Sequence, residues 1–176
     1  MLVIVGHGPS VVGKRRGPWL DEQTVVRLKW GEIPNALDWG TRTDYLCASH
    51  PSFWTARKAN GYPDMDCEFW FLPEKYCPPI PGVRQASNTW LDYYQTHREQ
   101  EAAPKKSLRK ASTGLKAVFC AVEFLQPEEI GLLGFDMIFH PEVPTFKWNN
   151  TTGGYCHDAR AEQRALFALP VKITEL

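Results

Sequence analysis

Short, mostly apolar runs that end in glycine, proline or polar residues recur along the chain and predict the strands of a sheet. Leu2–Val5, Thr24–Leu28, Tyr45–Ala48 and Ile130–Leu133 are such runs, and Cys67–Leu72 is a further candidate. Runs of this length with few interrupting polar residues are typical of strands covered on both faces, as in a parallel sheet.

Longer segments with apolar residues at helical spacing lie between and after these runs. They cover Phe53–Asn60, Asn88–Gln100, Ser112–Leu125 and His157–Leu169, and prolines follow the last two. Strands that alternate with helices are the signature of an α/β architecture. The pattern therefore predicts a Rossmann-like, three-layer α/β/α sandwich with a mainly parallel sheet.

The chain has 176 residues, a length typical of one domain, and we expect residues 1–176 to form a single domain. Its 20 Lys and Arg balance 20 Asp and Glu, so that the formal net charge is zero. Nucleic-acid coats and polybasic membrane binders need an excess of positive charge. The composition therefore argues against both, and we expect no nucleic-acid partner.

The compartment is predicted from apolar runs and cysteines. No run reaches the roughly 18 apolar residues of a membrane span, and the start of the chain is typical of a strand rather than a signal peptide. The five cysteines are an odd number without CxxC spacing. We expect a cytoplasmic protein without a membrane span or a metal. A zinc site of Cys67, Cys77, Cys156 and His157 is conceivable, but its spacings are not those of a metal knuckle.

The first candidate for chemistry is Gly6-His7-Gly8-Pro9-Ser10, directly after the first predicted strand. Glycines there let the backbone approach a ligand, and free N–H groups favour a phosphate. The spacing is not G-x-G-x-x-G, and no acidic ribose ligand follows about 20 residues on. A dinucleotide site is therefore disfavoured, and a plain tight turn stays open as the alternative.

Two further candidates lie later in the chain. Ser112-Thr113-Gly114 opens a predicted helix, where it either caps the free amides or holds a phosphate or ribose. Gly134-Phe135-Asp136 closes a predicted strand, where ligands of open α/β sheets bind. A turn with one core aromatic residue is the simpler interpretation of the second segment.

The fourth candidate is His157 with Glu162, five positions later at the start of the last predicted helix. The positive end of a helix dipole lowers the pKa of a histidine and favours its neutral form, which can accept a proton from a hydroxyl. Glu162 could orient that histidine or cap the helix. The alternative is a histidine that only caps the helix.

Taken in chain order, these four segments resemble the sialyltransferases of glycosyltransferase family 29. Val3–Gly13, with Arg27 and Asp38 further on, resembles the family's long motif. Ala111–Gly114, followed by the apolar helix and Gly134-Phe135, resembles the short motif, which contains P-S-T-G. His157 and Glu162 match the very short motif, H-x4-E.

The resemblance implies a function and assigns roles to residues. It implies a metal-independent, inverting transfer of sialic acid or a related sugar from a CMP-sugar, which is a co-substrate rather than a cofactor, to a glycan or other hydroxyl acceptor, on a GT-A-variant fold. His157 would be the catalytic base, assisted by Glu162. The residues expected to hold the nucleotide are Gly6, His7, Gly8, Pro9, Ser10, Arg27, Lys29, Ser112, Thr113, Gly114, Gly134, Phe135 and Asp136.

Two positions depart from the family pattern, because His7 and Lys29 stand where the family has asparagines. That departure leaves open a nucleotide- or glycan-binding module without catalysis. A Rossmann-like oxidoreductase or methyltransferase is a third reading, disfavoured because the acidic ribose ligand is not evident.

Overall fold

The computed structural model describes residues 1–29, 33–48, 53, 66–73, 79–99, 111–140 and 159–176. Within them, the strands form one seven-stranded sheet in which every pairing is parallel. The strands are β1 (Leu2–Val5), β2 (Thr24–Leu28), β3 (Tyr45–Ala48), β4 (Glu68–Phe71), β5 (Val83–Gln85), β6 (Glu129–Leu133) and β7 (Lys172–Glu175).

The strand order in space is β5-β4-β3-β2-β1-β6-β7. The chain therefore builds outward from β1 through β5, returns, and adds β6 on the other side of β1. Leu2 accordingly pairs with both Thr24 of β2 and Ile130 of β6. The order reverses between β1 and β6, and ligands of open α/β sheets bind outside the carboxyl ends of the strands at such a switch point.

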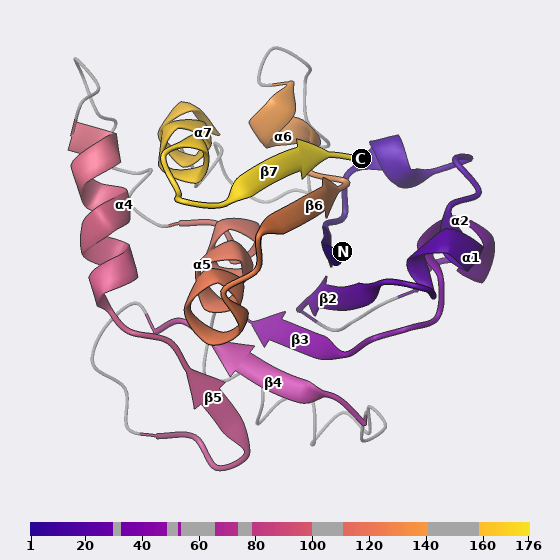
Figure 1. The fold of residues 1–176 in the computed structure, drawn as a ribbon, viewed down its shortest axis with the longest axis horizontal. Helices are drawn as coiled ribbons and strands as arrows, with labels where there is room; N and C mark the ends of the chain where they lie inside the picture. Colours follow the sequence, from indigo (N-terminus) through magenta and orange to yellow (C-terminus); the bar gives the residue numbers. More distant parts are fainter. Residues whose placement is uncertain (30–32, 49–52, 54–65, 74–78, 100–110, 141–158) are drawn as a thin grey trace, which may run out of the picture.

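Helices cover both faces of the sheet (Figure 1). The long helix α5 packs on the central strands, flanked by α4 and α7, while α1 and α2 cover the opposite face. The predicted three-layer α/β architecture is therefore confirmed, and the sheet is parallel throughout. The helices are η1 (Pro9–Val11, a 3-10 turn), α1 (Gly17–Leu20), α2 (Ala36–Trp39), α4 (Thr89–Glu99), α5 (Thr113–Leu125), α6 (Asp136–Phe139) and α7 (Ala159–Phe167).

The two-residue period of a strand explains why β1 is apolar at every position. Leu2 and Ile4 belong to the core under α5, whereas Val3 and Val5 belong to the core under α1 and α2. Successive side chains of a strand point to opposite faces, so a strand with helices on both sides must be apolar throughout. Because both faces of the central strands are buried, these strands could be predicted from their apolar runs.

Several predicted elements match the structure, and others lie outside it or were missed. The bounds of β1, β2 and β3 agree with the prediction. The edge strands β5 and β7 have exposed or half-buried residues and no apolar run, and no strand was predicted there. The predicted helix Phe53–Asn60 lies outside the described residues except for Phe53. In the described part of the chain, no helix is long and apolar enough to span a membrane.

Asp38 of α2 fixes the chain between η1 and α1. Its carboxylate accepts hydrogen bonds from the backbone N–H groups of Gly13 (2.9 Å) and Arg15 (2.8 Å). These two bonds, the largest influences, lower the pKa of the Asp38 carboxyl below its ordinary value. Asp38 is only 6% exposed. Its ionised carboxylate therefore holds the segment between η1 and α1 in place.

The hydrogen bonds of the Asp38 carboxylate predict that the stability of the protein depends on pH. Because the pKa of Asp38 is lower in the folded protein than in the unfolded chain, its ionisation stabilises the fold above its ordinary pKa of 3.8. That contribution is lost as the pH falls through the folded pKa. We expect Asp38→Asn to lower the urea midpoint near neutral pH and to lose less further stability than the wild type between about pH 6 and about pH 3.

Asp92→Asn, which removes an exposed carboxyl of α4, controls for the loss of one charge. Equal losses of stability on acidification in Asp38→Asn and wild type would contradict the assignment.

Candidate functional site

The turns that follow β1 and β6 are in direct backbone contact at the switch point. The N–H of Gly6 donates to the carbonyl of Leu133 (2.7 Å), and the N–H of Gly8 donates to the carbonyl of Gly134 (2.9 Å). A Cβ at position 8 would lie 2.7 Å from the Gly134 oxygen. Gly134 itself has φ of +73°, which favours glycine. Only glycines allow the two turns to approach this closely.

A side-chain contact reinforces this junction. The backbone N–H of Ser10 donates to Oδ2 of Asp136 (3.0 Å), and the Ser10 hydroxyl donates to Oδ1 of the same carboxylate. Ser10 and Asp136 lie 126 positions apart in the chain. The first and third predicted segments therefore form one structural unit.

The start of α5 completes the cluster. The Ser112 hydroxyl accepts a hydrogen bond from the N–H of Leu115 (3.1 Å) and caps the helix, as the capping alternative expects. A Cβ at Gly114 would lie 2.5 Å from Cε1 of Phe135, so the aromatic ring lies directly against the helix start. We call Gly6–Ser10, Ser112–Gly114 and Gly134–Asp136 together the switch-point cluster.

Glu162 of α7 binds the same helix start. Its carboxylate accepts from the backbone N–H and from the hydroxyl of Ser112, both at 2.6 Å, and its side chain is fully buried. Charge-assisted bonds of this kind are shorter and stronger than neutral ones. The structure therefore places the predicted residue Glu162 at Ser112, where it holds α7 and α5 together.

The switch-point cluster has the groups that bind an oxyanion and a ribose. The 13-residue helix α5 directs its N-terminal end toward Phe135, and unpaired N–H groups at a helix start favour a phosphate. Thr113 adds a hydroxyl in the first turn. Glu162 and Ser112 already accept from the N–H groups of Ser112 and Leu115. Among the residues that the structure describes, the amides of Thr113 and Gly114 have no acceptor, so they are the candidates for binding a ligand.

Three further nucleotide-binding candidates are His7, which is within the switch-point cluster, Arg27 on β2, and Lys29 just after β2. His7 lies in the turn after β1, with its ring centroid 6.4 Å from that of Trp39. Lys29 directly follows β2, and its N–H donates to the carbonyl of Cys47 (2.8 Å). Lys29 therefore lies at the same edge of the sheet as His7 and the rest of the switch-point cluster.

Arg27 has a structural role on the opposite face from α5. It is 2% exposed, and its guanidinium donates to the carbonyls of Trp39 (2.8 Å) and Arg42 (3.0 Å) and to the Thr43 hydroxyl (2.9 Å). Burial lowers the pKa of Arg27 to about 10, and the charge of Asp21 opposes that shift. These contacts hold the chain between α2 and β3, and nucleotide binding by Arg27 stays a prediction.

Two sequence predictions concern residues that the structure does not describe. His157, the predicted base, lies outside the described residues, as do Cys77 and Cys156 of the conceivable zinc site. Within the described ranges, no three His, Cys, Asp or Glu side chains are grouped as metal ligands.

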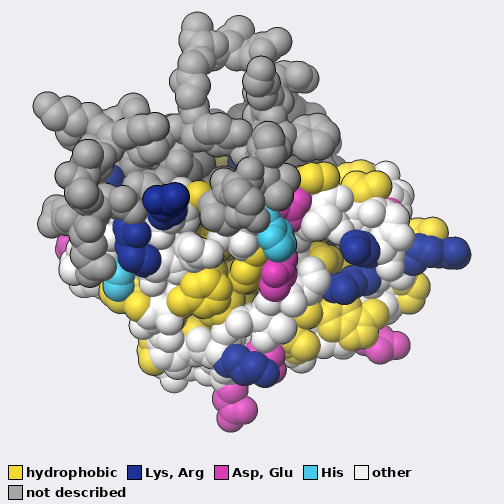
Figure 2. Space-filling view, turned by 90° about the horizontal axis from the view of Figure 1, so that it is seen from above, with side chains coloured by type: hydrophobic (Ala, Val, Ile, Leu, Met, Phe, Trp, Pro, Cys, Tyr) yellow, Lys and Arg dark blue, Asp and Glu magenta, His cyan; other side chains and the backbone are white. Residues whose placement is uncertain are grey.

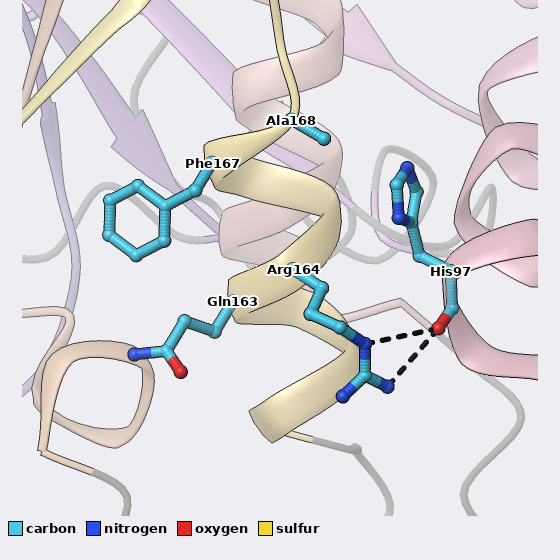
Figure 3. Close-up of a pocket in the computed structure, with 5 residues that line it drawn as sticks. All are labelled: His97, Gln163, Arg164, Phe167 and Ala168. Carbon is cyan, nitrogen blue, oxygen red and sulfur yellow. Dashed lines mark hydrogen bonds between the residues drawn. The ribbon is translucent and has the colours of Figure 1, made fainter. Parts of the chain in front are cut away.

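A shallow depression between α4 and α7 lies outside the cluster (Figure 3). Arg164 points across it and donates to the carbonyl of His97 from Nε (3.3 Å) and Nη2 (3.1 Å). The Gln163 amide likewise donates to the carbonyl of Ile138 (3.0 Å). The side chains of Arg164 and Gln163 are thus engaged in holding helices together, and the switch-point cluster remains the candidate site.

Comparisons with known proteins find similar structures but no sequence relatives. No protein-family model matches the chain, and no curated protein sequence matches it. The sialyltransferase CstII from Campylobacter jejuni, solved with the substrate analogue cytidine-5'-monophosphate, has a TM-score of 0.59 at 14% identity, over 99% of this chain and 79% of that chain. An α-2,3-sialyltransferase from Campylobacter jejuni, solved in its apo form, has a TM-score of 0.57 at 16% identity, over 99% of this chain and 74% of that chain. At these identities the likeness shows the fold.

The resemblance to glycosyltransferase family 29 is wrong. CstII, the first of the similar structures, belongs to family 42 and not to family 29. The motifs behind the resemblance are short, and glycine turns and a capped helix start recur wherever a parallel sheet forms a switch point. Their order along the chain therefore reflected the architecture rather than membership of family 29.

The sequence analysis missed the pairings within the site. Ser10 and Asp136 were both candidates, but nothing in the sequence indicated that they bind each other. The contact between Glu162 and Ser112 was equally hidden, although a carboxylate beside a capping serine is a common partner for helix amides. Predicting these contacts from the sequence would have required knowing which strands are neighbours in the sheet.

The buried contact of Glu162 gives a prediction about stability. Glu162→Ala leaves the Ser112 N–H without its partner and opens a cavity, so we expect a loss of about 3 kcal/mol in the free energy of unfolding. Glu162→Gln keeps the volume and one acceptor oxygen, and we expect a loss of about 1 kcal/mol.

Urea denaturation followed by circular dichroism measures both losses. Glu128→Ala removes an exposed carboxylate near the end of α5 and should stay within about 0.5 kcal/mol of wild type. A Glu162→Ala variant as stable as Glu128→Ala would show that the Ser112 contact does not hold the two helices.

Proposed function

We propose that the switch-point cluster binds a cytidine monophosphate group and that the protein transfers a sugar, sialic acid or a related one, from a CMP-activated donor to a hydroxyl acceptor. The observation that carries this proposal is the meeting of Gly6–Ser10, Ser112–Gly114 and Gly134–Asp136 at one edge of the sheet. The fold supports it, because a sialyltransferase of similar structure was solved with cytidine-5'-monophosphate.

The groups of the cluster suit the parts of such a nucleotide. The N-terminal end of α5 and the amides of Thr113 and Gly114 would bind the phosphate oxygens. Phe135, which is 7% exposed and lies against Gly114, would limit the depth of the site, and the Thr113 hydroxyl and the oxygen of the Ser10 hydroxyl would bind polar edges. Binding would orient the donor, and in group transfer from a good leaving group orientation supplies much of the rate.

The proposed reaction is a single displacement. The oxygen of the acceptor hydroxyl forms a bond to the anomeric carbon of the donor sugar, while the bond from that carbon to the phosphate oxygen breaks. The electron pair leaves with CMP, and the configuration of the sugar is inverted. We propose His157 as the base that takes the hydroxyl proton. Glu162 would act as a positioning residue, because it holds Ser112 at the start of α5.

Nucleotide selectivity tests the proposed binding site. We expect CMP and CMP-sugars to raise the melting temperature of the protein, while UDP and GDP and their sugars do not, because a ligand that binds only the folded state stabilises it. Gly8→Ala should abolish the shift, because its Cβ would meet the Gly134 carbonyl and separate the two turns.

Gly82→Ala provides the matched control. Gly82 has φ of +74° and open space around it, so alanine there should cost about 1 kcal/mol of stability away from the cluster. That variant should keep the CMP shift. Equal stabilisation by all nucleotides, or loss of the shift in both variants, would contradict a cytidine site at the switch point.

The catalytic base gives a separate prediction. His157→Ala should lower the rate of sugar transfer by about 10²- to 10⁴-fold, the usual contribution of a general base, and should leave the CMP-induced melting shift within error of wild type. Release of CMP from CMP-sialic acid in the presence of a glycan acceptor measures the rate. Wild-type turnover in His157→Ala would remove this residue from the mechanism, and CMP binding without any transfer by wild type would indicate a binding module.

A further inference from the structure

The turn between η1 and α1 concentrates positive charge on a chain whose formal net charge is zero. We call Val12–Arg16 the basic turn. Its Lys14 and Arg15 are exposed and Arg16 is half-buried. Within the described part of the chain, the side chains of Lys14 and Arg16 make no hydrogen bond or ion pair, so their charges are available to a partner.

The basic turn has a fixed backbone conformation. Gly13 and Arg15 both have positive φ, +77° and +53°, and the second value is unfavourable for a residue with a Cβ. The buried Asp38 carboxylate holds both residues through their N–H groups. The backbone that carries the three basic side chains is therefore held in place before any partner arrives.

Two exposed aliphatic residues accompany the basic side chains, one within the turn and one next to Asp38, which holds the turn. Val12 is 64% exposed, and Leu37, next to Asp38 on α2, is 48% exposed. Together they are half of the large hydrophobic residues that the described residues leave exposed, the others being Met1 and Phe167. Figure 2 shows Lys and Arg side chains with hydrophobic side chains between them on the side of the molecule where η1 and α1 lie in Figure 1.

From this combination we infer that the basic turn, with Val12 and Leu37, docks on the surface of an anionic lipid membrane. Basic side chains are attracted to an anionic leaflet, while neighbouring aliphatic side chains enter the boundary between headgroups and acyl chains. A nucleic acid would use the charges but would leave Val12 and Leu37 in water, because single strands bind aromatic faces rather than aliphatic ones. The inference does not depend on the proposed transferase function.

Flotation of the full chain with lipid vesicles tests the inference. We expect the protein to bind vesicles that contain phosphatidylserine with phosphatidylcholine, and not vesicles of phosphatidylcholine alone. Lys14→Glu/Arg16→Glu should reduce binding by at least tenfold, since each basic side chain near an anionic leaflet contributes roughly a fivefold change in partition. Val12→Ser should also reduce binding, by several-fold, because it removes the exposed aliphatic side chain.

The charge-reversal variant and Val12→Ser each have a control variant on another surface of the protein. Arg160→Glu reverses one charge, half of the change in Lys14→Glu/Arg16→Glu, at an exposed residue of α7, and Phe167→Ser replaces a side chain that is 54% exposed. Both controls should bind the vesicles as wild type does. Melting temperatures establish that all variants are folded.

Three results would overturn the inference. The first is failure of the wild type to bind phosphatidylserine vesicles. The second is an equal loss of binding in Arg160→Glu and Lys14→Glu/Arg16→Glu, which would indicate a response to overall charge. The third is binding to polyuridylate that Lys14→Glu/Arg16→Glu abolishes and Val12→Ser leaves unchanged, together with vesicle binding unaffected by Val12→Ser, which would indicate a nucleic-acid surface.

Discussion

The approach of two turns at the switch point is the constraint on which the candidate site depends. The N–H groups of Gly6 and Gly8, after β1, donate hydrogen bonds to the carbonyls of Leu133 and Gly134 at the end of β6. A Cβ at Gly8 would meet a backbone oxygen, which cannot move away as a side chain could. The Ser10–Asp136 contact and the position of Phe135 against α5 follow from that approach, because each requires the two strand ends to lie at this distance.

The fold could be predicted from the sequence where burial on both faces governs the residue type. β1 and most of β2 are apolar because helices cover both of their sides, and the bounds of both strands could be predicted from the sequence. β5 and β7 lie at the two edges of the sheet, where exposure relaxes that requirement, and they escaped detection. The four-residue helices α1 and α2 were missed because one turn is too short to show a helical period.

The site could be predicted as a set of segments but not as a set of contacts. Glycines after strands and Ser112 before a helix are local signals, and the structure brings those segments together. Which carboxylate binds which donor depends on strand order, so the partners of Asp136 and Glu162 were hidden. The whole-chain charge likewise concealed Lys14–Arg16, because averaging over 176 residues cancels a local excess.

The distance in sequence between Ser10 and Asp136 has a consequence for how the protein is made. The 125 residues between them (11–135) must leave the ribosome before this contact can close the junction of β1 and β6. Pairings over such long loops cost entropy before they yield contacts, and they slow folding. During synthesis β1 can pair early with β2, but its other edge stays without a neighbour until β6 has emerged. An exposed strand edge of this kind invites association with other chains, so the nascent protein has a stronger need for chaperones than its final stability would indicate.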